Sequence, residues 1–81
     1  MSLLRKNING SDLVMEKQEL ALGVFCYMVW LQNDTVLFPM IYKKEFGGWF
    51  FVDKMTLIEF LEIEKEISIS IEEFEGNNSN P

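Results

Sequence analysis

Residues 20–31, LALGVFCYMVWL, are the longest apolar run in the chain, and their conformation decides the fold. After Gly23 the residue types become β-branched and aromatic, which are the types enriched in strands. The polar pair Asn33-Asp34 separates this run from a second β-rich stretch, residues 35–42. Two such runs around a short polar loop predict a β-hairpin.

A single long helix over residues 12–31 is the alternative. Asn33-Asp34 is a weaker turn than Asn-Gly, because a two-residue hairpin turn of this kind needs φ > 0 at its second residue as well. The long helix would carry Gly23 at a cost of about 1 kcal/mol relative to alanine. The hairpin is the preferred interpretation, and the long helix stays open beside it.

Upstream of the hairpin we expect a helix over residues 11–22. Ser11 or Asp12 can serve as its N-cap, its interior is rich in good helix formers, and Gly23 marks its end. Residues 1–10 are polar in part and contain a chain-breaking Asn-Gly pair, so we expect a flexible lead-in there.

Two further features follow in the β-rich region. Pro39 cannot donate a hydrogen bond to a neighbouring strand, so the second strand of the hairpin should be an edge strand or carry a bulge. Residues 46–48, Phe-Gly-Gly, predict a turn, and residues 49–53 predict a third strand.

The last third of the sequence predicts a helix and then a strand. Thr56 and Glu59 have the spacing of a capping box, which favours a helix over residues 57–65. Isoleucine then alternates with polar residues over positions 67–72, a period of two that is typical of a half-buried strand. Residues 76–81, GNNSNP, have no apolar side chain to bury and predict a disordered tail.

These elements predict a small α+β domain over residues 11–75. Their order is α-β-β-β-α-β, with helices covering one face of an antiparallel sheet. If residues 12–31 are a single helix instead, the order becomes that helix followed by β-β-α-β. With 81 residues there is room for one hydrophobic core.

The composition argues against an enzyme. The sequence has no histidine, which removes the commonest general base and the commonest metal ligand. Its one cysteine, Cys26, cannot complete a zinc site or an internal disulfide, and it lies in the apolar run as a small core residue. We therefore predict no catalytic residue, no cofactor and no metal site.

Charge is concentrated at one end of the chain. Residues 1–54 hold six acidic and six basic side chains, whereas residues 55–81 hold seven glutamates and one lysine, so the net charge of −6 lies in the last third. This region would repel nucleic acid and anionic membrane and attract a basic protein surface. The 12-residue apolar run is too short to cross a bilayer, which needs about 20 residues. A lone cysteine and no recognisable signal peptide predict a cytoplasmic protein.

Nine of the eleven aromatic residues fall between positions 25 and 51. If residues 24–31 form a strand, both of its faces are apolar, and helices can cover only one face of the sheet. Large exposed apolar patches are rare on monomers, so we expect self-association, as a homodimer, or a protein partner.

The function predicted from these features is a small, acidic, non-catalytic protein-binding module of the inhibitor, immunity or adaptor type. It would present its glutamate-rich last third to a basic partner surface, with aromatic side chains as anchors. The alternative is a homo-oligomeric structural domain. The predicted partner-binding residues are Glu62, Glu66, Glu73, Trp49 and Tyr42.

Overall fold

The computed structural model describes residues 3–53 and 56–79, with side chains described as far as Gly76. Five strands come first and two helices follow. The elements are β1 (Leu3–Ile8), β2 (Ser11–Ala21), β3 (Val24–Leu31), β4 (Phe38–Lys43), β5 (Gly48–Phe51), α1 (Ile58–Glu62) and α2 (Glu64–Ser79). The predicted α+β domain is therefore wrong in both of its orders, α-β-β-β-α-β and the long helix followed by β-β-α-β. The protein is mostly β, with the order β-β-β-β-β-α-α.

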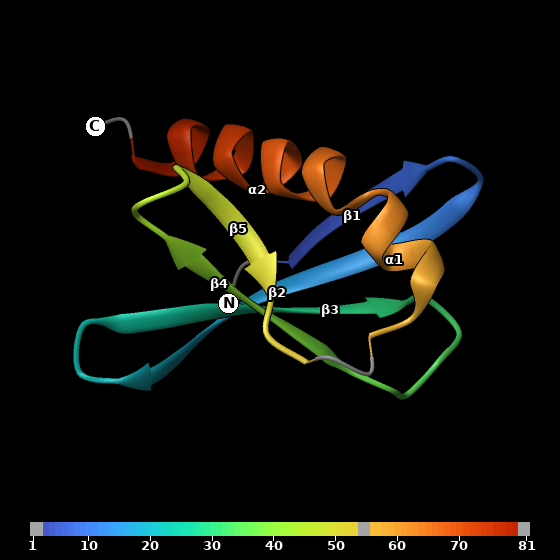
Figure 1. The fold of residues 1–81 in the computed structure, drawn as a ribbon, viewed down its shortest axis with the longest axis horizontal. Coiled ribbons are helices and arrows are strands. Elements are labelled where there is room, and N and C mark those ends of the chain that lie inside the picture. The colour runs from blue at the N-terminus through green and yellow to red at the C-terminus, as the bar shows by residue number, and fades with distance from the viewer. Residues whose placement is uncertain (1–2, 54–55, 80–81) are drawn as a thin grey trace.

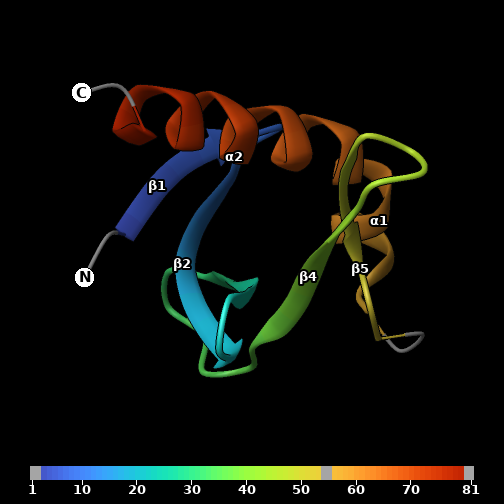
Figure 2. The ribbon, with the colours of Figure 1, turned by 90° about the vertical axis from the view of Figure 1, so that its left-hand side faces the viewer.

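The strands form one antiparallel sheet in the order β1-β2-β3-β4-β5, so each strand pairs with its neighbour in the sequence. The sheet curls into a half-barrel (Figure 1). Seen from the side, α2 lies across the open mouth of this half-barrel, with β1 on one side and β5 on the other (Figure 2). The concave face of the sheet is the face turned toward α2, and the convex face is the opposite one.

A tight turn at Asn9-Gly10 makes β1 possible. Both residues have positive φ angles, 52° and 85°, and the pair joins Ile8 directly to Ser11 in the register of β1 and β2. Asn-Gly suits this two-residue hairpin turn because both positions need a left-handed backbone. Residues 3–8, in the predicted lead-in, thus form a paired strand, and the flexibility of that end of the chain stays a prediction.

The helix predicted over residues 11–22 is wrong, and so is the long helix over residues 12–31. Residues 11–21 form β2, which pairs with β1 on one side and β3 on the other. Leu13 and Met15 face the concave side and are fully buried. Pairing on both edges and burial of alternate side chains outweigh the helix propensity of this stretch, which is at most a few tenths of a kcal/mol per residue.

The strand over residues 24–31 and its antiparallel pairing with the next strand are confirmed. The connection between β3 and β4 covers residues 32–37 and is longer than the two-residue loop we expected. Beyond it, the predicted turn at residues 46–48 and third strand at residues 49–53 correspond to the β4–β5 turn and to β5.

Pro39 lies in a central strand, so the prediction of an edge or a bulge is wrong. It stands opposite Met28 of β3, and its carbonyl accepts a hydrogen bond from the N–H of Val52 at 3.0 Å. The nitrogen and the carbonyl of one strand residue point to the same side. The missing N–H therefore faces the side of β5, just past the end of that strand at Phe51, and no hydrogen bond to β3 is lost.

Two helices replace the helix and strand that the last third predicts. The capping box is wrong, because α1 begins after Leu57 without a side-chain cap, and the Thr56 hydroxyl donates to the carbonyl of Asp53 at 2.5 Å. The strand over residues 67–72 is also wrong, because this segment belongs to α2. α2 runs on to Ser79, through the first residues of the predicted disordered tail, whereas residues 80–81 lie outside the described part of the chain.

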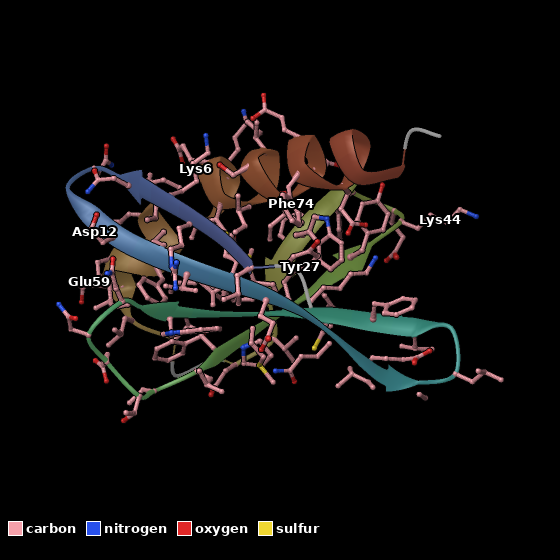
Figure 3. The ribbon with its side chains drawn as sticks, turned by 180° about the vertical axis from the view of Figure 1, so that it is seen from behind. Lys6, Asp12, Tyr27, Lys44, Glu59 and Phe74 are labelled. Carbon is pink, nitrogen blue, oxygen red and sulfur yellow. The ribbon has the colours of Figure 1, made fainter. Side chains whose placement is uncertain are left out.

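One hydrophobic core fills the space between α2 and the concave face. Its buried side chains come from the sheet (Leu13, Met15, Tyr27, Val29, Phe38, Met40, Trp49, Phe51) and from the helical segment (Phe60, Ile63, Ile67, Ile71). Figure 3 shows Phe74 and Tyr27 in this space between the helix and the sheet. Cys26 is also fully buried, as expected, and burial raises the pKa of its thiol.

Candidate functional site

Helix α2 closes the free edge of β5 with its side chains. The backbone N–H of Trp49 donates to the hydroxyl of Ser68 at 2.8 Å, and the N–H of Phe51 donates to a carboxylate oxygen of Glu64 at 2.8 Å. These are the edge groups of a strand that would otherwise be free to pair with another chain. Gly48 allows this close approach, because a Cβ atom there would lie 3.0 Å from the hydroxyl oxygen of Ser68.

A groove follows the line where α2 passes the β4–β5 hairpin. One part is a hollow of about 360 Å³, lined chiefly by Phe46 to Phe50 on the hairpin and by Glu64, Lys65, Ser68, Ile69 and Glu72 on the helix. The other part is a hollow of about 330 Å³, lined by Tyr42, Trp49, Glu72 and Glu75. Trp49 and Glu72 line both hollows, so we treat them as one feature, the hairpin–helix groove.

Three aromatic rings connect this groove to the core. Tyr42 packs edge-on against Trp49 with 5.6 Å between ring centres, and Trp49 packs edge-on against Tyr27 at 4.9 Å. Their exposed fractions rise outward, from 0% for Tyr27 through 6% for Trp49 to 48% for Tyr42. The buried rings of Tyr27 and Trp49 therefore fix the orientation of the half-exposed Tyr42 ring, which packs against Trp49.

Glu75 is tied to two residues of the sheet. The Tyr27 hydroxyl donates to its carboxylate at 2.6 Å, and the Lys17 ammonium lies 3.0 Å from the same oxygen. Partial burial acts to raise the pKa of Glu75, but the hydrogen bonds from Tyr27 and Lys17 and the charge of Lys17 outweigh it and lower that pKa. For Tyr27, burial first and the bond to Glu75 second raise the pKa of the phenol.

The glutamates of α1 and α2 fall into two groups. Glu64 and Glu75 are half-buried and bonded to the sheet. The other five are exposed, and no hydrogen bond or ion pair joins their side chains to the described part of the chain: Glu59, Glu62, Glu66, Glu72 and Glu73. We call this set of five the acidic face: Glu66 and Glu73 lie on the outward side of α2, Glu72 lines the groove, and Glu59 and Glu62 lie on α1 near the β1–β2 turn. Lys65 is the basic residue beside them.

The structure brings together some of the predicted binding residues and separates others. Tyr42 and Trp49 are partners in the groove, although Trp49 is almost entirely buried. Glu66 and Glu73 are seven residues apart on α2, two helical turns, and therefore share its outward side. Glu62 ends α1 and lines a separate hollow with Asn9 and Ser11 at the β1–β2 turn.

Sequence reasoning missed the residues that complete the groove, Glu72 and Glu75, and the two that hold Glu75, Lys17 and Tyr27. One signal was present: in a β2–β3 hairpin Lys17 stands directly opposite Tyr27. Reading residues 11–22 as a helix concealed it. No local signal connects either residue to Glu75, which lies 48 positions beyond Tyr27.

Within residues 3–53 and 56–79, no group of three or more histidine, cysteine or acidic side chains is placed to hold a metal ion. None of the helices in this part of the chain is long and apolar enough to cross a membrane. Comparisons with family models, with curated proteins and with solved structures returned no significant match.

Proposed function

We propose that this protein is a small, non-catalytic binding module that presents its acidic face to a basic surface on a partner protein. The observation that carries the proposal is the state of the five glutamates of that face. They are exposed, and the described structure gives them no bonding partner. A fold that needed these charges for its own stability would pair them, as it pairs Glu64 and Glu75.

Charge supports a protein partner over other classes. The last third carries the net charge of −6, so its field repels phosphate groups of nucleic acid and anionic lipid. A basic protein surface is attracted over a distance of about 8 Å at physiological salt and is steered toward binding. The acidic face would thus speed association, while the neighbouring groove supplies apolar contact.

The type of module remains the one expected from the sequence. An inhibitor, an immunity protein or an adaptor needs a stable recognition surface and neither a catalytic residue nor a cofactor, so none is proposed here. The proposed compartment is the cytoplasm, because Cys26 is buried as a thiol in the core and a reducing environment suits it.

Charge reversal with a matched control tests the proposal. The test variant changes Glu62, Glu66 and Glu73 to lysine. The control variant introduces lysine at exposed positions outside the helices: Leu22, Gln32, Asn33, Thr35 and Glu45. Both variants bring the net charge from −6 to zero, but only the first alters the acidic face. Proteins captured from native cell extract by the wild type and both variants are compared, and the association rate of the purified partner is then measured at several salt concentrations.

We expect the partner to bind the wild type and the control variant. The test variant should associate about tenfold more slowly and lose most of its salt dependence. Two results would refute the proposal: equal capture by the folded test variant, or no protein that binds the wild type better than that variant.

The convex face of the sheet favours a second candidate, a homo-oligomeric structural domain. Helix α2 lies on the concave side (Figure 2), and Phe60 of α1 packs against Phe38 and Phe51 on the same side. The convex face carries half-buried apolar side chains from two neighbouring strands: Met28 and Trp30 on β3, and Ile41 on β4. A second copy packed on this face would bury them. Light scattering over a concentration series tests this candidate. A dimer that Trp30→Glu dissociates would support it, and a monomer at every concentration would exclude it.

A further inference from the structure

The part of the hairpin–helix groove beside Tyr42 combines aromatic rings with carboxylates. Tyr42 and Trp49 come from adjacent strands, and Glu72 and Glu75 come from successive turns of α2. The hollow they enclose measures about 330 Å³ and opens to solvent beside the half-exposed ring of Tyr42. Rings and carboxylates both attract cations, the rings through the negative charge on their faces.

The charges around this hollow leave one negative charge without a partner. Glu75 is neutralised by Lys17 at 3.0 Å and also accepts the hydroxyl of Tyr27. Glu72 is exposed, and no ion pair or hydrogen bond in the described part of the chain involves its side chain. A single positive charge in the hollow would therefore neutralise the charge of Glu72.

The protein already binds one cation of its own in this way. The ammonium of Lys17 lies 3.0 Å from the carboxylate of Glu75 and 4.5 Å from the centre of the Phe25 ring. This internal site joins one carboxylate to one ring, the same pair of groups that Glu72 and Tyr42 offer in the hollow. Lys17 is held by its own partners, so the second pair is left for a cation from outside.

We propose that the hollow formed by Tyr42, Trp49, Glu72 and Glu75 binds one arginine side chain of the partner protein. This inference rests on the proposed function and identifies the residue type that the partner inserts. Arginine suits the site better than lysine, because its flat guanidinium stacks on an aromatic face while it donates two hydrogen bonds to one carboxylate. The apolar continuation of the groove at Phe46, Phe50 and Ile69 would contact the partner residues next to that arginine.

Short peptides test this site without a known partner. The probes are acetyl-Gly-Arg-Gly-amide, the same peptide with lysine, and the same peptide with citrulline, which keeps the shape of arginine without its charge. Each is titrated into isotope-labelled protein, and the NMR signals of the two indole N–H groups are followed. Trp49 reports on the hollow, and Trp30 on the convex face is the internal reference.

Glu72→Gln and Glu73→Gln form a matched pair of variants. Each removes one negative charge from an exposed position on α2, but only Glu72 lines the hollow. We expect the arginine peptide to shift the Trp49 signal and not that of Trp30. Its affinity should fall by about threefold or more in the Glu72 variant and change less than about twofold in the Glu73 variant.

Three results would overturn the proposal. The citrulline peptide could bind as well as the arginine peptide, the lysine peptide could bind as well or better, or the two variants could weaken binding equally. The outcome is also separable from that of the proposed function. If the peptide binds as expected but charge reversal leaves the partner's association unchanged, the proposed function fails. If charge reversal slows association and Glu72→Gln leaves peptide binding unchanged, only the arginine site fails.

Discussion

Replacing Tyr27 by phenylalanine removes one oxygen atom from the junction of the sheet and α2. The ring is fully buried, so phenylalanine can occupy the same space, and only the 2.6 Å hydrogen bond to Glu75 is lost. A hydrogen bond to a charged group contributes about 1.5–3 kcal/mol. Because the Glu75 side chain is 34% exposed, water replaces part of this contribution, and we expect the variant to lose about 1.5 kcal/mol at pH 7.

The same variant should change how stability depends on pH. The pKa of Glu75 is lowered in the folded protein below its ordinary value of 4.5, so its ionised form stabilises the fold above pH 4.5. That stabilisation is lost as the pH falls through the lowered pKa. For Tyr27 the folded pKa is raised above 10.0, so its contribution is complete below pH 10 and is lost at higher pH. The difference between wild type and variant should therefore shrink at both extremes.

Urea unfolding at pH 3, 5, 7 and 11 measures this difference. Tyr42→Phe is the control, because it removes the other tyrosine hydroxyl from a half-exposed side chain, and we expect it to cost less than about 0.5 kcal/mol. A Tyr27→Phe loss below about 0.5 kcal/mol at pH 7, or an equal loss at pH 3 and pH 7, would refute the reasoning about Glu75.

Three further predictions concern the contacts between β5 and α2 and the connection from β5 to α1. Ser68→Ala should lower the free energy of unfolding by about 1–2 kcal/mol, because it leaves the buried N–H of Trp49 without an acceptor. Hydrogen exchange at that amide should become faster. Unchanged exchange there would contradict this. Gly48→Ala should lower the free energy of unfolding by about 1 kcal/mol in the wild type, because the new Cβ contacts the Ser68 hydroxyl. The loss should be smaller in the Ser68→Ala background. If the two losses are additive in chemical denaturation, that contact does not exist. Thr56→Val should lower the free energy of unfolding by about 1 kcal/mol, because it removes the hydrogen bond to the Asp53 carbonyl. Glu59→Ala should leave the free energy of unfolding almost unchanged, and the effect of the double variant should equal the sum of the two single effects. A double variant whose loss differs strongly from that sum would show that Thr56 and Glu59 do form a capping box.

The sequence predicted best where a single local signal settled the structure. Residues 24–31 are so rich in β-branched and aromatic side chains that a strand was the better interpretation, and β3 has those bounds. The β4–β5 hairpin was equally accessible, because its glycine pair marks the turn. In that hairpin Tyr42 stands opposite Trp49, so their contact could have been predicted from the register alone.

β2 could not be predicted from its own residues. Its middle and end are good helix former, and its strand state depends on β1 and β3 on its two edges. A signal for β1 was nevertheless present in Asn9-Gly10, one of the strongest short indicators of a hairpin. If the Asn-Gly pair is interpreted as the end of a flexible lead-in, no strand is predicted over residues 3–8. Residues 11–21 then have no partner strand on that side, and their helix propensity favours a helix.

The last third was misread because two periods fit the same isoleucines. Ile67 and Ile71 are two apart from Ile69 and four apart from each other, so strand and helix patterns both match. The structure buries Ile67 and Ile71 and leaves Ile69 at 46% exposed, which is the helical outcome. Including Ile63, four positions earlier and also buried, would have favoured the helix. Glu72 and Glu75 then fall on the groove side of α2, a position that the strand interpretation could not give them.

The place of α2 in the chain has a consequence for synthesis on the ribosome. All five strands emerge before the helix that covers their concave face and the edge of β5. Until α2 has left the exit tunnel, the nascent sheet exposes an apolar trough and unpaired N–H groups at that edge, the surfaces through which partly folded chains aggregate. A chain that ends after β5 and is held on the ribosome by a linker long enough to clear the exit tunnel should therefore bind general chaperones, and the chain that includes α2 on the same linker should not.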